Sequence, residues 1–452
     1  MGCKLNFTTL KDSVFIYLSL RLFTEGVEEF LIQPTAWYYI IKYLGESELF
    51  LGLTMASFSA GALLFSPILG AFDLKFRSPK KIALFCCCTS FIGNLLYTIP
   101  VNGYFALFGR FLCGVGTAAD GIACAVLARG TAIENRAKAY LYLEGLYCFG
   151  TICGPTLGSA LIFNVDIYGW KINKGNSPGF ILIFIWLTLL LYTLLLPRDL
   201  TENAESSDRS VIEVESDEDY DTPRSALPSS IVSDENSEKI VEEIEEDREE
   251  SWAPLPPMVL CLYYQVFLSF FVYTAISFYV PLLMKFHLGL GLTFVKLIYL
   301  NSTLFTSVLF FSTHFMLQCI SEQMLLFLSV FSQLMPLLIT FYFGLFWNDA
   351  TSVNESYLLL CSMLILGAIF INTPLVSSLL SKITPAKKAS FYQSLTYTAM
   401  HLGFCSSRLV AGATFAKMPM TFASAAMAFC WLFGLTWLGY EYRNYSFVLK
   451  EV

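Results

Sequence analysis

Charged side chains are scarce in this sequence of 452 residues, of which 14% are charged and 56% hydrophobic. A soluble domain carries about 25% charged residues, so the composition excludes an ordinary soluble protein and predicts a chain within a bilayer. Histidine is also rare, and none of the 13 cysteines is spaced with the three histidines as zinc ligands are. We therefore predict free thiols, no metal site and no cofactor. The sequence also lacks a nucleophile–base pair and a phosphate-binding loop, so we do not expect an enzyme.

Positive charge is not in excess either, because the formal net charge is −8, and this predicts no binding of nucleic acid. The negative charge is concentrated in one segment: residues 198–252 hold 20 acidic and 5 basic side chains. Such a segment, rich in Ser, Glu and Asp with few aromatic residues, cannot bury enough apolar surface to fold. We predict a disordered cytosolic loop over residues 198–254.

Long hydrophobic runs are what the sequence has in abundance. A helix of about 20 apolar residues crosses a bilayer, and six such runs precede the acidic loop while six follow it. We predict an all-α polytopic membrane protein of two six-helix halves, 1–197 and 255–440, with a tail over 441–452. The predicted transmembrane helices span residues 13–43, 49–72, 80–100, 103–129, 136–163, 179–197, 255–286, 292–319, 323–346, 355–382, 386–416 and 419–440.

Loop charges predict the orientation of these helices. Basic residues cluster after the second, fourth and tenth helices, and all three loops are cytosolic if both termini are cytosolic. The loop after the ninth helix is acidic and leads to Asn354, which begins a glycosylation sequon on the opposite side. We therefore predict cytosolic termini and a glycan on Asn354.

Two of the apolar runs contain residues that hydrocarbon does not favour. An arginine at the centre of a membrane helix costs about 2.5–3.5 kcal/mol on insertion scales, so it should face a partner or a polar pathway. A Gly-Pro step loses a backbone hydrogen bond and is tolerated where helices pack closely. The two motifs are Arg110-x-x-x-Gly114 and Gly150-x-x-x-Gly154-Pro155-x-x-Gly158.

Both motifs resemble signatures of the major facilitator superfamily, with Cys113 in place of a glutamine and Ser159 in place of the last glycine. Residues 70–81 resemble the family's loop between the second and third helices, although the aspartate stands one residue early. The resemblance implies the major facilitator fold of 12 transmembrane helices. It also implies a cytosolic gate between the halves, formed by Gly70, Asp73, Arg77 and Lys80.

Further stretches look like the lysosomal branch of this superfamily that is linked to neuronal ceroid lipofuscinosis, the major-facilitator-domain-containing protein 8 group. They are residues 33–39, 56–61, 66–70, 134–136 and 407–412. This likeness implies a lysosomal or endosomal membrane protein that conducts chloride or exports a small solute. Tyr445-Ser-Phe-Val448 resembles a sorting signal read by adaptors of those compartments.

Charged and polar residues within the predicted helices are candidates for the solute pathway. Arg21, Glu25, Glu28 and Glu29 lie near one face of the first helix, where a carboxylate would accept a proton beside the arginine. The alternative is an ion pair that only fixes this helix to a neighbour. In the second half, Arg408 occupies a place that corresponds to that of Arg110 in the fourth helix. The candidate pathway residues are Arg21, Glu25, Glu28, Arg110, Asp120, Glu144, Gln393 and Arg408.

Gly114, Gly150, Gly154, Pro155 and Gly158 are interpreted as packing and hinge residues, because small side chains let the fifth and eighth helices approach and slide. Together these features predict an endolysosomal facilitator that moves a small anion or organic solute by alternating access, with protons as a candidate coupling ion. Two alternatives are a chloride-conducting channel on the same fold and a receptor or scaffold whose acidic loop recruits partners.

Overall fold

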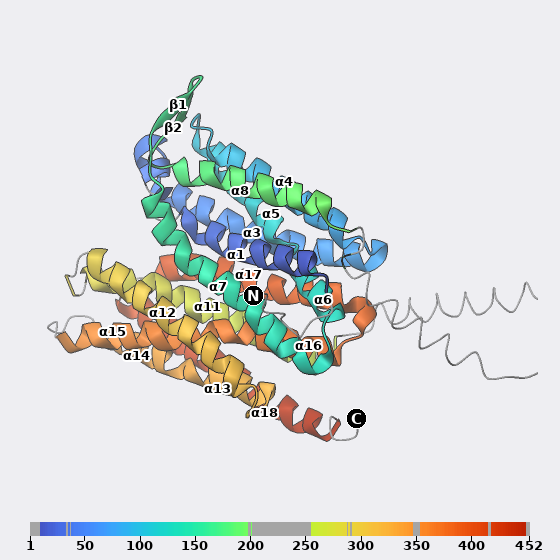
Figure 1. Ribbon diagram of the computed structural model, residues 1–452. Helices are drawn as coiled ribbons and strands as arrows, with labels where there is room; N and C mark the ends of the chain where they lie inside the picture. The colour runs from blue at the N-terminus through green and yellow to red at the C-terminus, as the bar shows by residue number, and fades with distance from the viewer. Residues whose placement is uncertain are drawn as a thin grey trace, which may run out of the picture.

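The computed structural model describes residues 10–197 apart from 33, 34 and 37, and then residues 200, 255–286, 288–289, 292–346, 353–414 and 417–448. These residues form a helical bundle in two halves (Figure 1). The acidic loop predicted at 198–254 lies almost wholly outside the described residues.

The first half contains one or two helices for each predicted span. They are α1 (Asp12–Leu31), α3 (Glu48–Phe76), α4 (Pro79–Tyr97), α5 (Gly103–Thr117) with α6 (Asp120–Arg129), α7 (Arg136–Ala160) and α8 (Ser177–Leu195). A short 3-10 turn, η2 (Ile133–Asn135), precedes α7. The α7 helix runs without interruption across the Gly154–Pro155 step.

The second half repeats the pattern. Its helices are α11 (Pro257–Phe286), α12 (Leu292–Met316), α13 (Glu322–Ser332) with α14 (Leu334–Leu345), α15 (Val353–Leu366) with α16 (Asn372–Ile383), α17 (Ala389–Thr414) and α18 (Lys417–Val448). The 3-10 turns η3 (Gly367–Ile371) and η4 (Ala386–Lys388) precede α16 and α17. In Figure 1, α7 and α17 lie between the two halves.

Three spans predicted as single helices are broken: α5 and α6 meet at Ala118–Ala119, α13 and α14 at Gln333, and α15 and α16 at η3. The first span also ends early, since α1 stops at Leu31 and a π-helical turn, η1 (Tyr38–Tyr43), follows. Residue 34 is a proline, and the missing backbone N–H of proline favours a break in a helix without requiring one.

Within the described residues, seven helical spans are long and apolar enough to cross a membrane, three of them counted across the breaks just described. The α1 helix is not among these seven, because four charged side chains lie between Arg21 and Glu29. The α18 helix continues beyond the predicted end at residue 440, so the backbone from Tyr445 to Val448 forms its last turn. Asn354 lies in the first turn of α15. The side chains of Asn354, Tyr445 and Val448 are not among those described.

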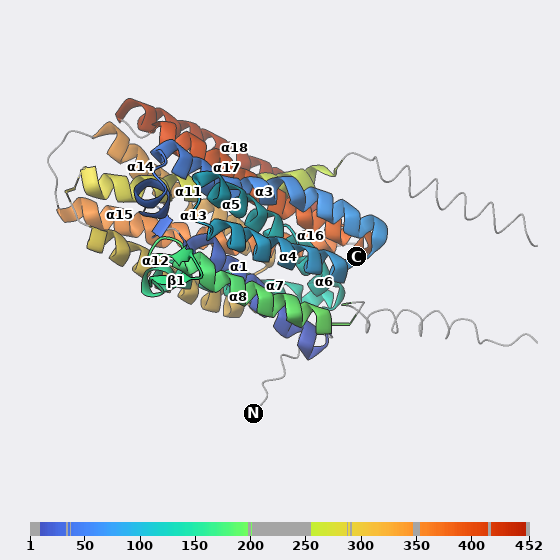
Figure 2. The same cartoon turned by 90° about the horizontal axis from the view of Figure 1, so that it is seen from above.

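A β-hairpin follows α7 where the sequence suggested only a loop. It pairs β1 (Val165–Ile167) with β2 (Trp170–Ile172) in antiparallel register, with Ile167 opposite Trp170. Its two turn residues, Tyr168 and Gly169, both have positive φ, as a tight two-residue hairpin turn requires. We call the end of the bundle that carries this hairpin the hairpin end, and the opposite end, where α18 stops, the tail end (Figures 1 and 2).

Candidate functional site

Arg21 is buried at the break between α5 and α6 and faces two carboxyl groups. Its Nη2 lies 2.6 Å from Glu25 Oε1 and 3.9 Å from Asp120 Oδ1. The same nitrogen donates to the backbone oxygen of Gly116 at 2.8 Å, so the cluster ties α1 to the broken helix. One guanidinium faces two carboxyl groups, and the cluster is therefore electrically neutral when one of them holds a proton.

Glu28 and Arg110 form a second buried pair inside the first half. Glu28 accepts hydrogen bonds from Asn94 Nδ2 at 2.5 Å and from Trp186 Nε1 at 2.9 Å, and its Oε1 lies 4.0 Å from Arg110 Nη1. The guanidinium carbon of Arg110 lies 4.3 Å from the centre of the Phe58 ring. Each side chain of this pair is 1% exposed or less, so the structure places Arg110 in the interior of one half.

Glu29 and Arg408 form a pair that joins the two halves. Arg408 Nη2 lies 3.3 Å from Glu29 Oε1, and its Nη1 donates to Ser59 Oγ at 2.7 Å. Tyr147 donates its hydroxyl to the other oxygen of Glu29 at 2.5 Å. The Arg408 side chain is 20% exposed while that of Glu29 is 2% exposed. This arginine therefore has an ionic partner in the other half and a side chain that is partly exposed.

A second polar group connects the halves, closer to the tail end. The Tyr397 hydroxyl of α17 donates to Glu144 of α7 and lies 3.3 Å from Cys124 Sγ of α6. One turn earlier, Gln393 Nε2 donates to the Tyr140 hydroxyl at 3.2 Å. The α17 helix thus contributes residues 393, 397 and 408 to contacts with the first half, each roughly aligned along one helix face.

The four residues predicted as a gate divide into two groups. Asp73 accepts a hydrogen bond from Ser390 of α17, and a Cβ on Gly70 would lie 2.6 Å from the Ser394 Cβ, so α3 and α17 are in close contact there. Arg77 is instead exposed and ends α3 in a left-handed conformation. Lys80 donates to the backbone oxygens of Leu194 and Leu196, and therefore caps α8 in its own half.

The predicted packing glycines of α7 lie at a different helix–helix contact from the predicted one between the fifth and eighth helices. A Cβ at Gly150, Gly154 or Gly158 would lie 2.3, 2.9 or 1.8 Å from backbone oxygens of α1, so these residues let α7 approach α1 rather than α12. Gly114 similarly permits contact between α5 and α3, where a Cβ would lie 1.9 Å from the Phe58 oxygen. The side chain of Pro155 is not among those described.

The candidate set therefore separates into four clusters, and Arg110 and Arg408 do not share one. The α3 helix lies between α5 and α17 and separates these two arginines, because its neighbouring residues Phe58 and Ser59 contact one arginine each. Sequence reasoning named Glu29 but did not select it, and it missed Tyr147 and Tyr397. Tyr147 lies three residues after the intramembrane acid Glu144, which was an available signal, whereas no acidic residue of α17 points to Tyr397.

Comparisons with known proteins agree with this architecture. A family model of the major facilitator superfamily matches residues 18–407. The chain belongs to the major facilitator superfamily. Solved structures of this superfamily's fold align along nearly the whole chain: the human organic anion transporter MFSD10 (TETRAN) covers 94% of this chain and 98% of its own, with TM-score 0.64 and 14% identity. The proton:xylose symporter XylE gives TM-score 0.69 at 13% identity, covering 94% of this chain and 95% of its own.

Plant proteins are among the curated relatives in sequence. An SPX domain-containing membrane protein of Oryza sativa subsp. indica is 29% identical over 189 residues, which are 40% of this chain and 26% of the relative. A protein of the same description from Arabidopsis thaliana is 25% identical over 218 residues, 45% of this chain and 31% of the relative. The matched part of this major facilitator thus spans about a quarter to a third of these relatives' length. Its family and fold are those of membrane transporters rather than enzymes.

Proposed function

We propose that this major facilitator carries a small anion, inorganic or organic, across an endolysosomal membrane by alternating access between its two halves. The observation that supports this most strongly is the Arg408–Glu29 pair. Arg408 belongs to one half and Glu29 to the other, and they are 3.3 Å apart with Arg408 partly exposed. An entering anion competes with Glu29 for the guanidinium, which offers five donors in a fixed fork.

Release of Arg408 from Glu29 is the step that links binding to movement. When an anion neutralises Arg408, the contact between α1 and α17 loses its ionic component, and the halves are held there mainly by Ser59. A proton on Glu29 has the same effect, while Tyr147 keeps the carboxyl group in place through its hydrogen bond. Glu29 therefore supplies a route for coupling to protons.

The endolysosomal placement is supported by features of the sequence. The resemblance to the lysosomal branch is strongest over residues 25–160, and the tyrosine motif at Tyr445–Val448 is of the kind that adaptors read. The sequon at Asn354 would carry a luminal glycan. Fluorescent tagging of the full chain against a lysosomal marker tests this part, and accumulation at the plasma membrane would refute it.

The transport proposal is tested with purified full-length protein in vesicles, using radiolabelled chloride, inorganic phosphate and lactate as separate probes. At least one probe should accumulate above empty vesicles. Hydrogen bonds to a charged group contribute about 1.5–3 kcal/mol, so Arg408→Gln should weaken uptake of that probe about 10- to 100-fold. Glu29→Gln should retain uptake but lose its stimulation by an acidic gradient.

Lys174→Gln provides a matched control, because it removes an exposed positive charge at the hairpin end without touching the pair. Its uptake should equal that of the unchanged protein. Equal uptake by Arg408→Gln would contradict the proposal. Chloride currents far above carrier turnover, in vesicles fused to a planar bilayer, would favour a channel in place of a carrier.

A further inference from the structure

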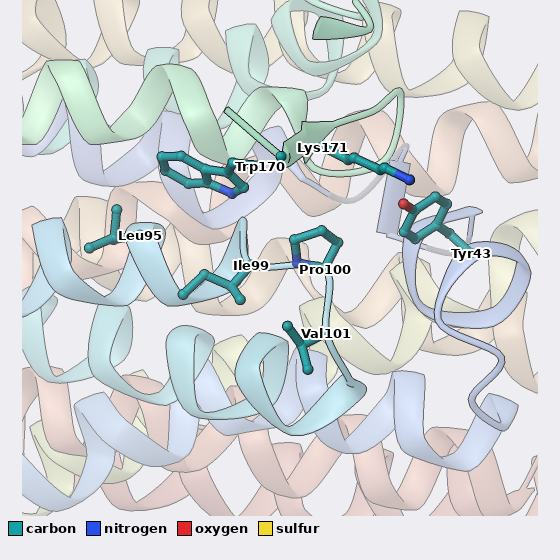
Figure 3. Close-up of a pocket in the computed structure, with 8 residues that line it drawn as sticks. Tyr43, Leu95, Ile99, Pro100, Val101, Trp170 and Lys171 are labelled. Atoms are coloured by element: carbon teal, nitrogen blue, oxygen red, sulfur yellow. The ribbon is translucent and has the colours of Figure 1, made fainter. Parts of the chain in front are cut away.

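A cavity at the hairpin end has a lining that the charged clusters do not use. Its volume is about 590 Å³, and it lies between the hairpin and the end of α4. Leu95, Ile99 and Val101 supply an apolar wall, Trp170 forms another side, and Lys171 and Tyr43 supply polar groups (Figure 3). Binding sites for small molecules and cofactors have similar volumes and a similar mixture of apolar walls with few polar groups.

The Trp170 wall is held in place by contacts outside the cavity. Its indole Nε1 donates to the backbone oxygen of Thr98 at 3.0 Å, and its ring meets Phe180 edge-on with centroids 5.5 Å apart. Asn176, in the loop between β2 and α8, donates from Nδ2 to the same Thr98 oxygen at 2.9 Å, and this bond fixes the loop. The cavity is therefore formed before any ligand enters.

The polar groups of the cavity are available to a ligand. Among the described residues, neither the Lys171 ammonium nor the Tyr43 hydroxyl has a hydrogen-bond or ion-pair partner. Asp166 lies opposite Lys171 in the strand register, but its carboxylate accepts from the backbone nitrogen of Gly169 at 2.9 Å. In Figure 3 the lysine and tyrosine side chains reach toward the same side of the cavity. A cation and a hydroxyl donor together favour an anionic group.

The position of the cavity relative to the bilayer favours an amphipathic ligand. The hairpin leaves the bundle across the direction of the helices, because it projects upward in Figure 1 and toward the viewer in Figure 2. In a bilayer crossed by these helices, the hairpin would therefore run along the membrane surface. Tyr168 at its tip is fully exposed, and aromatic residues are favoured at that level of a bilayer. The apolar wall comes from Leu95 in the last turn of α4 and from Ile99 and Val101 in the turn that follows it.

We propose that this cavity binds an anionic phospholipid from the leaflet at the hairpin end. The phosphate lies between Lys171 and Tyr43, and the first part of one acyl chain follows the wall of Leu95, Ile99 and Val101. The lipid fastens the hairpin to α4 of the first half. This site is separate from the proposed anion pathway and does not depend on it.

The test uses the full-length protein in a neutral detergent and dioctanoyl phosphatidylglycerol as the probe, with binding measured by native mass spectrometry and by the thermal midpoint. Dioctanoyl phosphatidylcholine and inorganic phosphate are the comparison ligands. Phosphatidylglycerol should bind most tightly and raise the midpoint. Lys171→Gln should weaken its binding about tenfold, as expected for the loss of one charge-assisted hydrogen bond.

Two further variants make the result decisive. Lys174→Gln removes an exposed charge from the same loop, outside the cavity lining, and should bind the lipid as the unchanged protein does. Ile99→Trp fills the apolar wall and should abolish lipid binding while leaving the protein folded, because Ile99 is only half-buried. Equal affinity for phosphatidylcholine, or the same affinity after Lys171→Gln, would overturn the proposal. Binding of inorganic phosphate as tight as that of phosphatidylglycerol would assign the site to a free anion and overturn it too.

Discussion

At the scale of single residues, the role of each charged side chain depends on the direction in which it points. Glu28 and Glu29 are neighbours in the sequence, yet Glu28 points into the first half toward Arg110 while Glu29 points across to Arg408. Consecutive residues of a helix are rotated by about 100°. The sequence predicted that these charges lie near one face of the helix, whereas the structure directs Glu28 and Glu29 to different partners that the sequence alone could not assign.

The Glu28–Arg110 pair is expected to stabilise the fold rather than to bind solute. Removing one partner leaves a buried charge without its counter-charge, which costs about 3–5 kcal/mol. Glu28→Gln and Arg110→Gln should therefore each lower the thermal midpoint strongly, and the double variant should lose less than the sum. Thermal unfolding of the purified proteins in one detergent measures this coupling. Single variants that unfold normally but fail to transport would place the pair in the pathway instead.

At the scale of helices, hydropathy predicts well where helices lie along the sequence but poorly whether each helix is continuous. Helix occupies each predicted span, but the breaks at Gln333 and η3 lie in apolar sequence that resembles the helix around it. The hairpin was missed because its strands are three residues each. Gly150 and Gly158 were recognised as packing residues from their spacing, whereas their partner, α1, could not be identified from one sequence.

The close packing of α7 against α1 can be tested by substitution. A Cβ at Gly158 would lie 1.8 Å from the Leu31 oxygen, and backbone atoms cannot move aside cheaply. Gly158→Ala should therefore destabilise the protein by about 1–3 kcal/mol. Gly52 lies in α3 with no atom within 4 Å of its Cβ position, so Gly52→Ala should be neutral or stabilising by up to about 1 kcal/mol. Equal thermal midpoints for the two variants would contradict the packing described.

At the scale of the whole molecule, α17 connects the two halves over most of its length. Near the tail end its residue Ser390 bonds Asp73, and further along Tyr397 bonds Glu144. Arg136 adds a bond to the Ser381 backbone oxygen at 2.6 Å. The tail end is thus closed by contacts between the halves. Movement of a solute toward that end requires these contacts to separate, while the pairs inside the first half stay together.

Tracer uptake with the tail end cross-linked tests the central claim, alternating access between the halves, most directly. Asp73→Cys with Ser390→Cys places thiols on side chains that touch between α3 and α17, and a short bis-methanethiosulfonate reagent can join them. Each single variant with the same reagent serves as control. The account predicts that uptake falls to the level of empty vesicles in the cross-linked double variant and returns after reduction. Undiminished uptake by fully cross-linked protein would contradict it.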